Sequence, residues 1–200
     1  MPSIREIRRK IKSVRQTQQV TRAMKMIAAS RLKRAQGQLL ASRPYAHKVE
    51  ELVATLTQRL TQEGLKMPAL LEPRPQAKDR LLLLFTSDKG LCGSYNVALL
   101  RETLKCYDKV KAEGGQTQFF VVGKKGRDFL VGHGFFLARE FVNFLRRPSF
   151  TQAEILGKEI VSHYLAHPEI SGTDVIYMDF KSVARQETAL YHLLPPSISK

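Results

Sequence analysis

The first sixty or so residues are nearly free of residues that break helices, and this constrains the fold more than any other feature of the chain. Residues 4–43 contain no proline and a single glycine. At a rise of about 1.5 Å per residue, this run alone predicts a helix about 60 Å long. Apolar residues keep helical spacing beyond Pro44 as far as Leu60, and Gly64 then supplies a stop signal. We therefore expect one long helix within residues 1–63.

Two pairs of residues have the spacing of a capping box, in which a Ser or Thr and a Glu each accept a hydrogen bond from the other's backbone N–H. Ser3 and Glu6 predict the start of the long helix. Thr151 and Glu154 predict the start of a second helix far along the chain.

The positive charge of the chain is concentrated in the helical segment. The chain has 33 Lys or Arg and 18 Asp or Glu residues, which give a formal net charge of +15. Residues 1–49 hold 13 of the cations and one acid, Glu6, and so carry +12, which leaves +3 for the rest. This asymmetry predicts an anionic partner: nucleic acid, anionic lipid or an acidic protein surface.

The apolar residues of the segment change pattern along its length. Both ends have the heptad spacing of a coiled-coil seam, with apolar side chains at Ile4, Ile7, Ile11, Val14, Val49, Val53, Leu56 and Leu60. In the middle the apolar side chains spread around the helix, as Ala23, Met24, Met26, Ile27, Ala28 and Ala29. A helix that is apolar on most sides needs to be enclosed on most sides. The pattern fits a helix through the centre of a bundle or a shaft inside a collar of other subunits.

The composition changes after residue 64. Residues 64–79, rich in proline, glycine and charge, predict a linker. Residues 80–200 then alternate short apolar runs with helical segments, which is typical of an α/β layer. We expect strands at 81–85, 119–123, 135–138, 174–180 and 188–194, and helices at 95–112, 125–131 and 151–166. The predicted fold class is α/β: a long N-terminal coiled-coil helix plus a Rossmann-like domain with a mostly parallel sheet.

Nothing in the sequence has the pattern of a catalytic centre. The loop Thr86–Gly93 follows the first predicted strand, where phosphate-binding loops lie, but it has neither of the glycine spacings of such loops. A nucleotide-binding enzyme built on this loop is therefore a weak alternative. We interpret the loop as a tight strand-to-helix connection, with structural roles for Asp88, Lys89, Gly90, Cys92 and Gly93.

Metal ligands are not evident either. His163 and His167 are one helical turn apart, but no third ligand accompanies them. We expect no catalytic residue, no metal and no cofactor.

A basic helix can also bind nucleic acid, and this is the main alternative to a protein partner. The aromatic residues lie almost wholly outside the basic segment, so that bases would have little to stack on. No known DNA- or RNA-binding motif is present. The apolar seam at Ile4–Val14 also favours a protein partner.

Two segments resemble a known family. Residues 4–14 read Ile-Arg-Glu-Ile-Arg-Arg-Lys-Ile-Lys-Ser-Val, and residues 20–36 read Val-Thr-Arg-Ala-Met-Lys-Met-Ile-Ala-Ala-Ser-Arg-Leu-Lys-Arg-Ala-Gln. Residues 86–96 read Thr-Ser-Asp-Lys-Gly-Leu-Cys-Gly-Ser-Tyr-Asn. Together these segments closely resemble the gamma subunit of F-type ATP synthases, and the later order of elements is similar as well.

The resemblance implies a non-catalytic rotor, the central stalk, which turns inside the ring of alternating alpha and beta subunits. It implies an α/β domain at the base of the stalk, beside the epsilon subunit and on the ring of c subunits. Ion flow turns the c ring and the stalk, while the catalytic residues lie on beta. The chain would be peripheral to the cell membrane, on the cytoplasmic side, and would bind no nucleic acid.

The resemblance also implies which residues meet the other subunits. These are Met24 and Lys25, with Ile27 nearby and with four candidate contacts to acidic surfaces of beta, namely Arg8, Arg9, Arg31 and Arg34. In the family a long C-terminal helix pairs with the N-terminal one. This sequence ends at Lys200, before such a helix, so it is either a fragment or a truncated protein, and the seam lacks that partner only if the protein is truncated.

Overall fold

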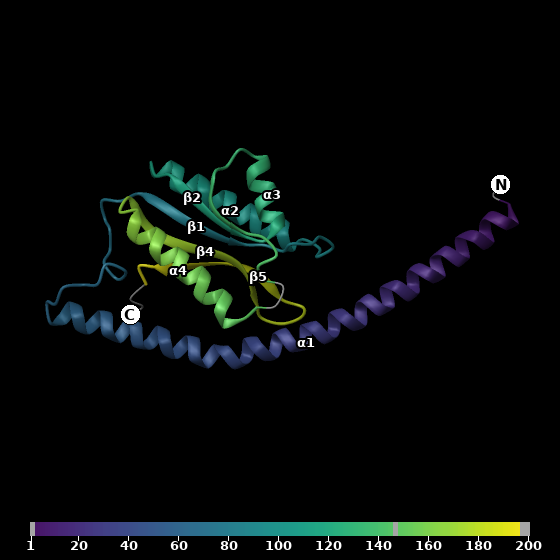
Figure 1. Cartoon of the computed structure of the whole chain (residues 1–200), viewed down its shortest axis with the longest axis horizontal. Coiled ribbons are helices and arrows are strands. Elements are labelled where there is room, and N and C mark those ends of the chain that lie inside the picture. The colour runs from purple at the N-terminus through teal and green to yellow at the C-terminus, as the bar shows by residue number, and fades with distance from the viewer. Residues whose placement is uncertain (1–2, 146–147, 197–200) are drawn as a thin grey trace. The chain divides into compact units, whose positions relative to one another are not determined.

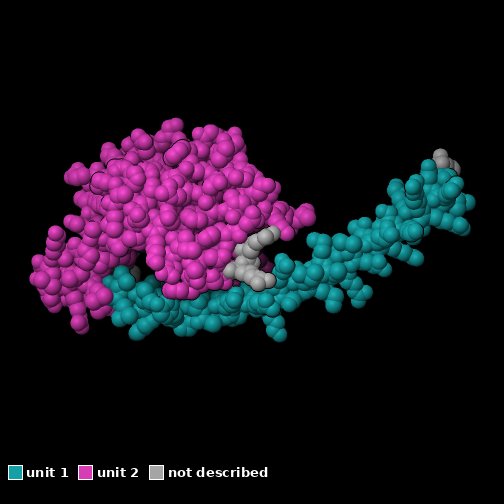
Figure 2. Space-filling model, viewed as in Figure 1, with its two compact units in different colours: residues 1–53 teal, residues 54–200 magenta. Residues whose placement is uncertain are grey.

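The computed structural model describes residues 3–145 and 148–196. The chain divides into two compact units, residues 1–53 and 54–200, which have different colours in Figure 2. The first unit is helical and the second has an α/β fold (Figure 1). The elements are α1 Ile4–Gln62, β1 Asp79–Phe85, α2 Tyr95–Ala112, β2 Thr117–Val122, α3 Lys124–Gly132, β3 Leu137–Phe141, α4 Phe150–Ala166, β4 Ile170–Phe180 and β5 Gln186–Leu194.

The long helix predicted from the sequence is present as α1. It begins with the predicted capping box: the Ser3 amide donates to Glu6 Oε2 at 2.9 Å, and the Glu6 amide donates to the Ser3 hydroxyl at 3.3 Å. Pro44 lies inside the helix without ending it, although proline has no N–H to donate to the preceding turn. Thr57, in the part of α1 that belongs to the second unit, is only 2% exposed.

The predicted stop signal at Gly64 ends the helix. Gly64 has a φ of +64°, which a residue with a side chain rarely adopts. The Leu65 amide donates to the Leu60 carbonyl at 3.0 Å, the long-range bond of a Schellman motif. The end of α1 is therefore fixed by its own backbone.

The second unit is built on a five-stranded sheet with the order β3-β2-β1-β4-β5. β1 pairs in parallel with β2 and β4, and β2 pairs in parallel with β3. β5 is antiparallel to β4 and lies at one edge. The predicted α/β class with a mostly parallel sheet is confirmed.

The core lies on both faces of the sheet, because successive residues of β1 point to opposite sides. Leu81 and Leu83 pack with α4 residues, and Leu82 and Leu84 pack with residues of α2 and α3. Figure 1 shows α4 on one side of the sheet and α2 and α3 on the other. All four leucines are at most 2% exposed, which explains why β1 reads as a continuous apolar run.

The predicted bounds of several elements are wrong by a few residues; β4, for example, begins at Ile170 instead of residue 174. The third strand occupies Leu137–Phe141 instead of residues 135–138, since Phe135 closes the end of α3 by donating from its amide to the Leu130 carbonyl. The capping box of α4 uses Ser149, whose amide donates to Gln152 Oε1 at 2.9 Å. Thr151 and Glu154 therefore lie inside the helix, where Glu154 pairs with Lys158 at 2.8 Å.

Candidate functional site

The first unit leaves its apolar side chains uncovered. No described residue from 3 to 53 is buried. Met26 is 70% exposed, Ile27 55% and Met24 54%. Apolar side chains this exposed over many turns mark a surface that binds other protein.

The same surface has almost no acid to neutralise its cations. Glu6 is the only acidic residue before Glu50, and its carboxylate accepts from the Ser3 amide. An ion pair within the unit lies at its C-terminal end, where Lys48 Nζ is 2.7 Å from Glu51 Oε2. The positive field of the N-terminal half is thus available to an external partner.

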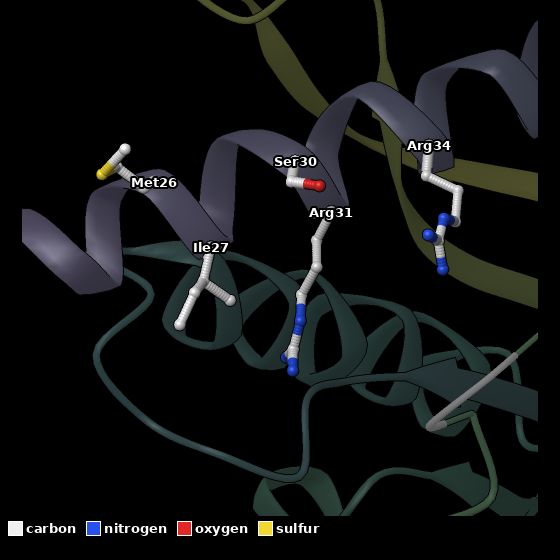
Figure 3. Close-up of a pocket in the computed structure, with 5 residues that line it drawn as sticks. All are labelled: Met26, Ile27, Ser30, Arg31 and Arg34. Atoms are coloured by element: carbon white, nitrogen blue, oxygen red, sulfur yellow. The ribbon is translucent and has the colours of Figure 1, made fainter.

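Three of the predicted interface residues share one side of α1. Ile27, Arg31 and Arg34 are spaced four and three residues apart, which places them on one helical face. They line a shallow hollow together with Met26 and Ser30 (Figure 3). In Figure 3 the side chains of Ile27, Arg31 and Arg34 extend from the same side of the helix. The hollow has two guanidinium groups beside the apolar side chains of Met26 and Ile27, a combination that fits an acidic and partly apolar surface.

The other predicted interface residues do not line this hollow. Met24 and Lys25 directly precede Met26, the first residue that lines it. Arg8 and Arg9 are about 27 Å away from Ile27, at about 1.5 Å per residue. The sequence did not lead us to expect Met26 and Ser30 in this surface, although the spacing of four residues from Met26 to Ser30 and from Ser30 to Arg34 is a signal that could have found them.

The loop 86–93 is held by side chains of its own unit. The Ser87 amide donates to Asn96 Oδ1 at 3.0 Å, and Asn96 Nδ2 lies 2.9 Å from the Ser87 hydroxyl. Asn96 Nδ2 also lies 3.2 Å from Cys92 Sγ. Asn96, in the first turn of α2, thus fastens both ends of the loop, a role that the sequence did not reveal.

Asp88 occupies the N-terminus of a helix that comes later in the chain. Its Oδ1 accepts from the Lys124 amide at 2.9 Å and from the Asn143 amide at 3.0 Å. Lys124 is the first residue of α3. Because this carboxylate takes the position where an anion would bind, the loop is poorly suited to hold a phosphate there.

Lys89, Gly90, Cys92 and Gly93 are all exposed. Gly93 has a φ of +60°, so that glycine suits this sharp turn. The Cys92 thiol is free. These residues form the outer surface of the loop and converge on no shared ligand position.

The backbone after β2 packs closely against Thr86, the first residue of this loop. A Cβ on Gly123 would lie 2.2 Å from the Thr86 carbonyl oxygen, and Gly123 has a φ of +103°. The Thr86 hydroxyl accepts from the Gly126 amide at 2.8 Å. The glycines after β2 therefore allow the ends of β1 and β2 to meet.

His163 of α4 and His167, which directly follows that helix, have non-metal partners. The rings of His163 and His167 are 4.3 Å apart. His163 Nε2 lies 2.7 Å from Gln118 Oε1, and His167 Nδ1 lies 2.7 Å from Glu169 Oε1. Burial lowers the pKa of His163, and His167 and Arg139 lower it further.

The described part of the chain holds neither a metal site nor a membrane span. Residues 3–145 and 148–196 contain no group of three or more His, Cys, Asp or Glu side chains that could hold a metal ion. Among the same residues, no helix has the length and hydropathy needed to span a membrane.

Comparison with known proteins gives a consistent result. The family model described as ATP synthase matches residues 3–200. The ATP synthase gamma chain of Syntrophobacter fumaroxidans is 36% identical over 203 residues, which cover 100% of this chain and 68% of that relative. The ATP synthase gamma chain of Trichlorobacter lovleyi is 37% identical over 195 residues, which cover 98% of this chain and 66% of that relative. The chain thus spans about two thirds of the length of these curated relatives.

A solved structure agrees in fold. The structure of the Tetrahymena thermophila mitochondrial ATP synthase, central stalk and c ring, matches 88% of this chain and 72% of its own chain. The TM-score is 0.69 at 26% sequence identity.

Proposed function

Because the chain belongs to the ATP synthase gamma-chain family, we propose that it is the central-stalk rotor subunit of an F-type proton-translocating ATP synthase. In this role it couples rotation of the membrane c ring to ATP synthesis or hydrolysis in a ring of alpha and beta subunits. The chain itself is non-catalytic, and the ATP chemistry takes place on beta. The nucleic-acid-binding alternative finds no support in the comparisons.

The observation that carries this proposal is the uncovered apolar and basic surface of α1. A helix that exposes Met24, Met26 and Ile27 by more than half has apolar area that another protein must cover. The segment around it is also basic, since residues 1–49 carry +12. A collar of acidic protein surface satisfies both properties.

We assign roles to the interface residues on this basis. Met24, Lys25 and Ile27 contact the enclosing subunits, and Arg8, Arg9, Arg31 and Arg34 face acidic surfaces of beta. Exposed charges interact over a Debye length of about 8 Å at physiological salt. Such contacts attract the collar without fixing the shaft in one rotational position.

Three segments of the chain would have different roles in the stalk. We assign residues 1–63 to the shaft, residues 64–79 to its connection and residues 80–200 to the base. The base would contact the epsilon subunit and the c ring, which makes the chain peripheral to the membrane on the cytoplasmic side of a bacterial cell.

Assembly tests the proposal. When the chain is coexpressed with alpha and beta subunits of a related enzyme, it is expected to co-purify with a ring that hydrolyses ATP. Replacing Arg31 and Arg34 by Glu should reduce its yield in the complex, whereas the same change at Arg101, an exposed residue of α2, should not. A ring that forms and excludes the unaltered chain would contradict the assignment.

A further inference from the structure

Backbone hydrogen bonds close two turns in the connection between α1 and β1. We call residues 64–79 the strap. The amides of Leu71 and Glu72 both donate to the Pro68 carbonyl, at 2.8 and 3.1 Å, and close a first turn. The Ala77 amide donates to the Arg74 carbonyl at 3.1 Å and closes a second. The strap therefore has internal hydrogen bonds that a flexible linker lacks.

Leu70 ties the first turn to the core. Its side chain packs against the hydrophobic cluster on the α4 face of the sheet, which includes Leu81 and Tyr164. The turn therefore rests on the sheet itself.

Arg74 ties the second turn to the end of α4. Its Nη1 atom lies 3.0 Å from the Tyr164 carbonyl oxygen, 2.9 Å from that of His167 and 3.0 Å from that of Ile170. The guanidinium group also lies over the Tyr164 ring, 3.8 Å from its centre. One side chain thus joins the strap to both the end of α4 and the start of β4.

The physical chemistry of a helix end explains this arrangement. The last carbonyls of a helix have no partner within the helix, and the C-terminus carries partial negative charge. Arg74 supplies donors and a positive charge at that position. Since Nη1 carries two hydrogens, at least one of them is shared between two of the three carbonyls.

The prolines on both sides of Arg74 restrict its backbone. Pro73 and Pro75 flank Arg74, and proline fixes its own φ and keeps the residue before it extended. The backbone of Arg74 therefore loses little freedom when the contact forms.

The other end of the strap is also fixed. Gly64 closes α1 with the backbone bond from Leu65 to Leu60. Thr57, two turns earlier, is buried within the same unit as the strap and the sheet. Hydrogen bonds thus hold the strap at both ends: to the final turn of α1 at one end, and to the end of α4 at the other.

We propose that Arg74 is a positioning residue of the rotor, which locks the strap onto α4 so that the final turns of α1 and the sheet turn as one body. This inference rests on the proposed function, because it concerns torque that enters through the base and leaves through the shaft. Without the Arg74 contact, part of the applied rotation would be absorbed by twisting of the strap.

Hydrogen exchange of the whole chain tests the locking itself. Arg74→Met keeps the length of the side chain but removes its donors and its charge. We expect the amides of Leu71, Glu72 and Ala77 to exchange roughly tenfold faster in this variant, with no change in β1, β2 and β4. Arg101→Met, on the exposed side of α2, is the matched control and should leave the strap unchanged.

Two exchange results would overturn the proposal. In one, the strap of the unaltered chain already exchanges as fast as an unstructured peptide. In the other, Arg74→Met accelerates exchange equally throughout the sheet, which would show that the residue only stabilises the fold.

The assembled enzyme tests the consequence for rotation. In membrane vesicles, the Arg74→Met enzyme is expected to hydrolyse ATP but to lose proton pumping against an imposed gradient. The Arg74→Lys enzyme is expected to retain part of that pumping. Pumping equal to that of the unaltered enzyme, with a loosened strap, would refute the inference and leave the proposed function intact. Failure of the unaltered chain to join the complex would instead refute the proposed function.

Discussion

Arg80 on β1 donates from Nε to Asp174 Oδ2 on β4 at 2.9 Å, across the middle of the sheet. The Asp174 side chain is only 10% exposed, and its other oxygen lies 2.8 Å from His192 Nδ1 on β5. Three strands therefore share one charged network. A charge this deeply buried depends on its partner.

Removing the carboxylate should accordingly be costly. We expect Asp174→Ala to lower the free energy of unfolding by about 3 kcal/mol, because Arg80 is left without its counter-ion. Glu154→Ala, which breaks an exposed pair with Lys158, should cost under about 1 kcal/mol. Urea unfolding of both variants measures the difference, and equal costs would show that the network contributes no more than a surface pair.

Met24→Lys should impair coupling more than folding. Met24 is 54% exposed in the chain alone, so a lysine there meets water and should change stability by less than about 0.5 kcal/mol. In the complex it would bury a charge in the collar. The ratio of proton pumping to ATP hydrolysis measures the effect, with Val183→Lys, at another exposed position, as the control. Normal pumping efficiency in Met24→Lys would count against the assignment of this residue.

His163 should make stability depend on pH. Burial, His167 and Arg139 lower the pKa of His163 in the folded state, against smaller opposing effects of Glu169 and Glu159. The unfolded chain therefore binds this proton more strongly, and stability is lost as the pH falls below about 6.5 towards the lowered value. His163→Gln should lose less stability than the unaltered chain between pH 7.5 and 5.5, which are roughly one unit either side of the unfolded pKa. Parallel stability curves would rule out this contribution.

Two glycines should respond to alanine in opposite directions. Gly123→Ala places a Cβ 2.2 Å from the Thr86 carbonyl oxygen at a φ of +103°. It should lower the free energy of unfolding of the second unit by about 1–3 kcal/mol. A Cβ on Gly37, inside α1, would meet no neighbouring group within 4 Å, so Gly37→Ala should stabilise the helix by about 0.5–1 kcal/mol. Thermal unfolding followed by circular dichroism measures both, and a stabilising Gly123→Ala would contradict the close approach.

Local signals in the sequence were sufficient for the helices and for most of the sheet. The capping pair of Ser3 and Glu6, the stop at Gly64 and the apolar run Leu81–Phe85 each describe interactions between neighbours in the chain. Phe135 misled the strand prediction, because its apolar side chain follows α3 in sequence while its amide caps that helix. Sequence spacing alone does not tell a residue that caps a helix from the first residue of a strand.

The candidate site was predictable in part for the same reason. Ile27, Arg31 and Arg34 share a helix face, and helical spacing reveals such a face directly. Arg74 could not be found in this way, since its partners Tyr164, His167 and Ile170 lie about ninety residues later, at separations of 90, 93 and 96. Contacts of this kind appear only when the sheet brings the two segments together.

The scarcity of acid between Glu6 and Glu50 has a consequence for the unassembled chain. Twelve lysines and arginines lie in that stretch, on a helix with no buried residue there, and their like charges repel one another. These are the peptide bonds that trypsin-like proteases cut, and local opening exposes them. Enclosure by a collar would shield the same bonds, so that copies made in excess of their partners would be degraded first.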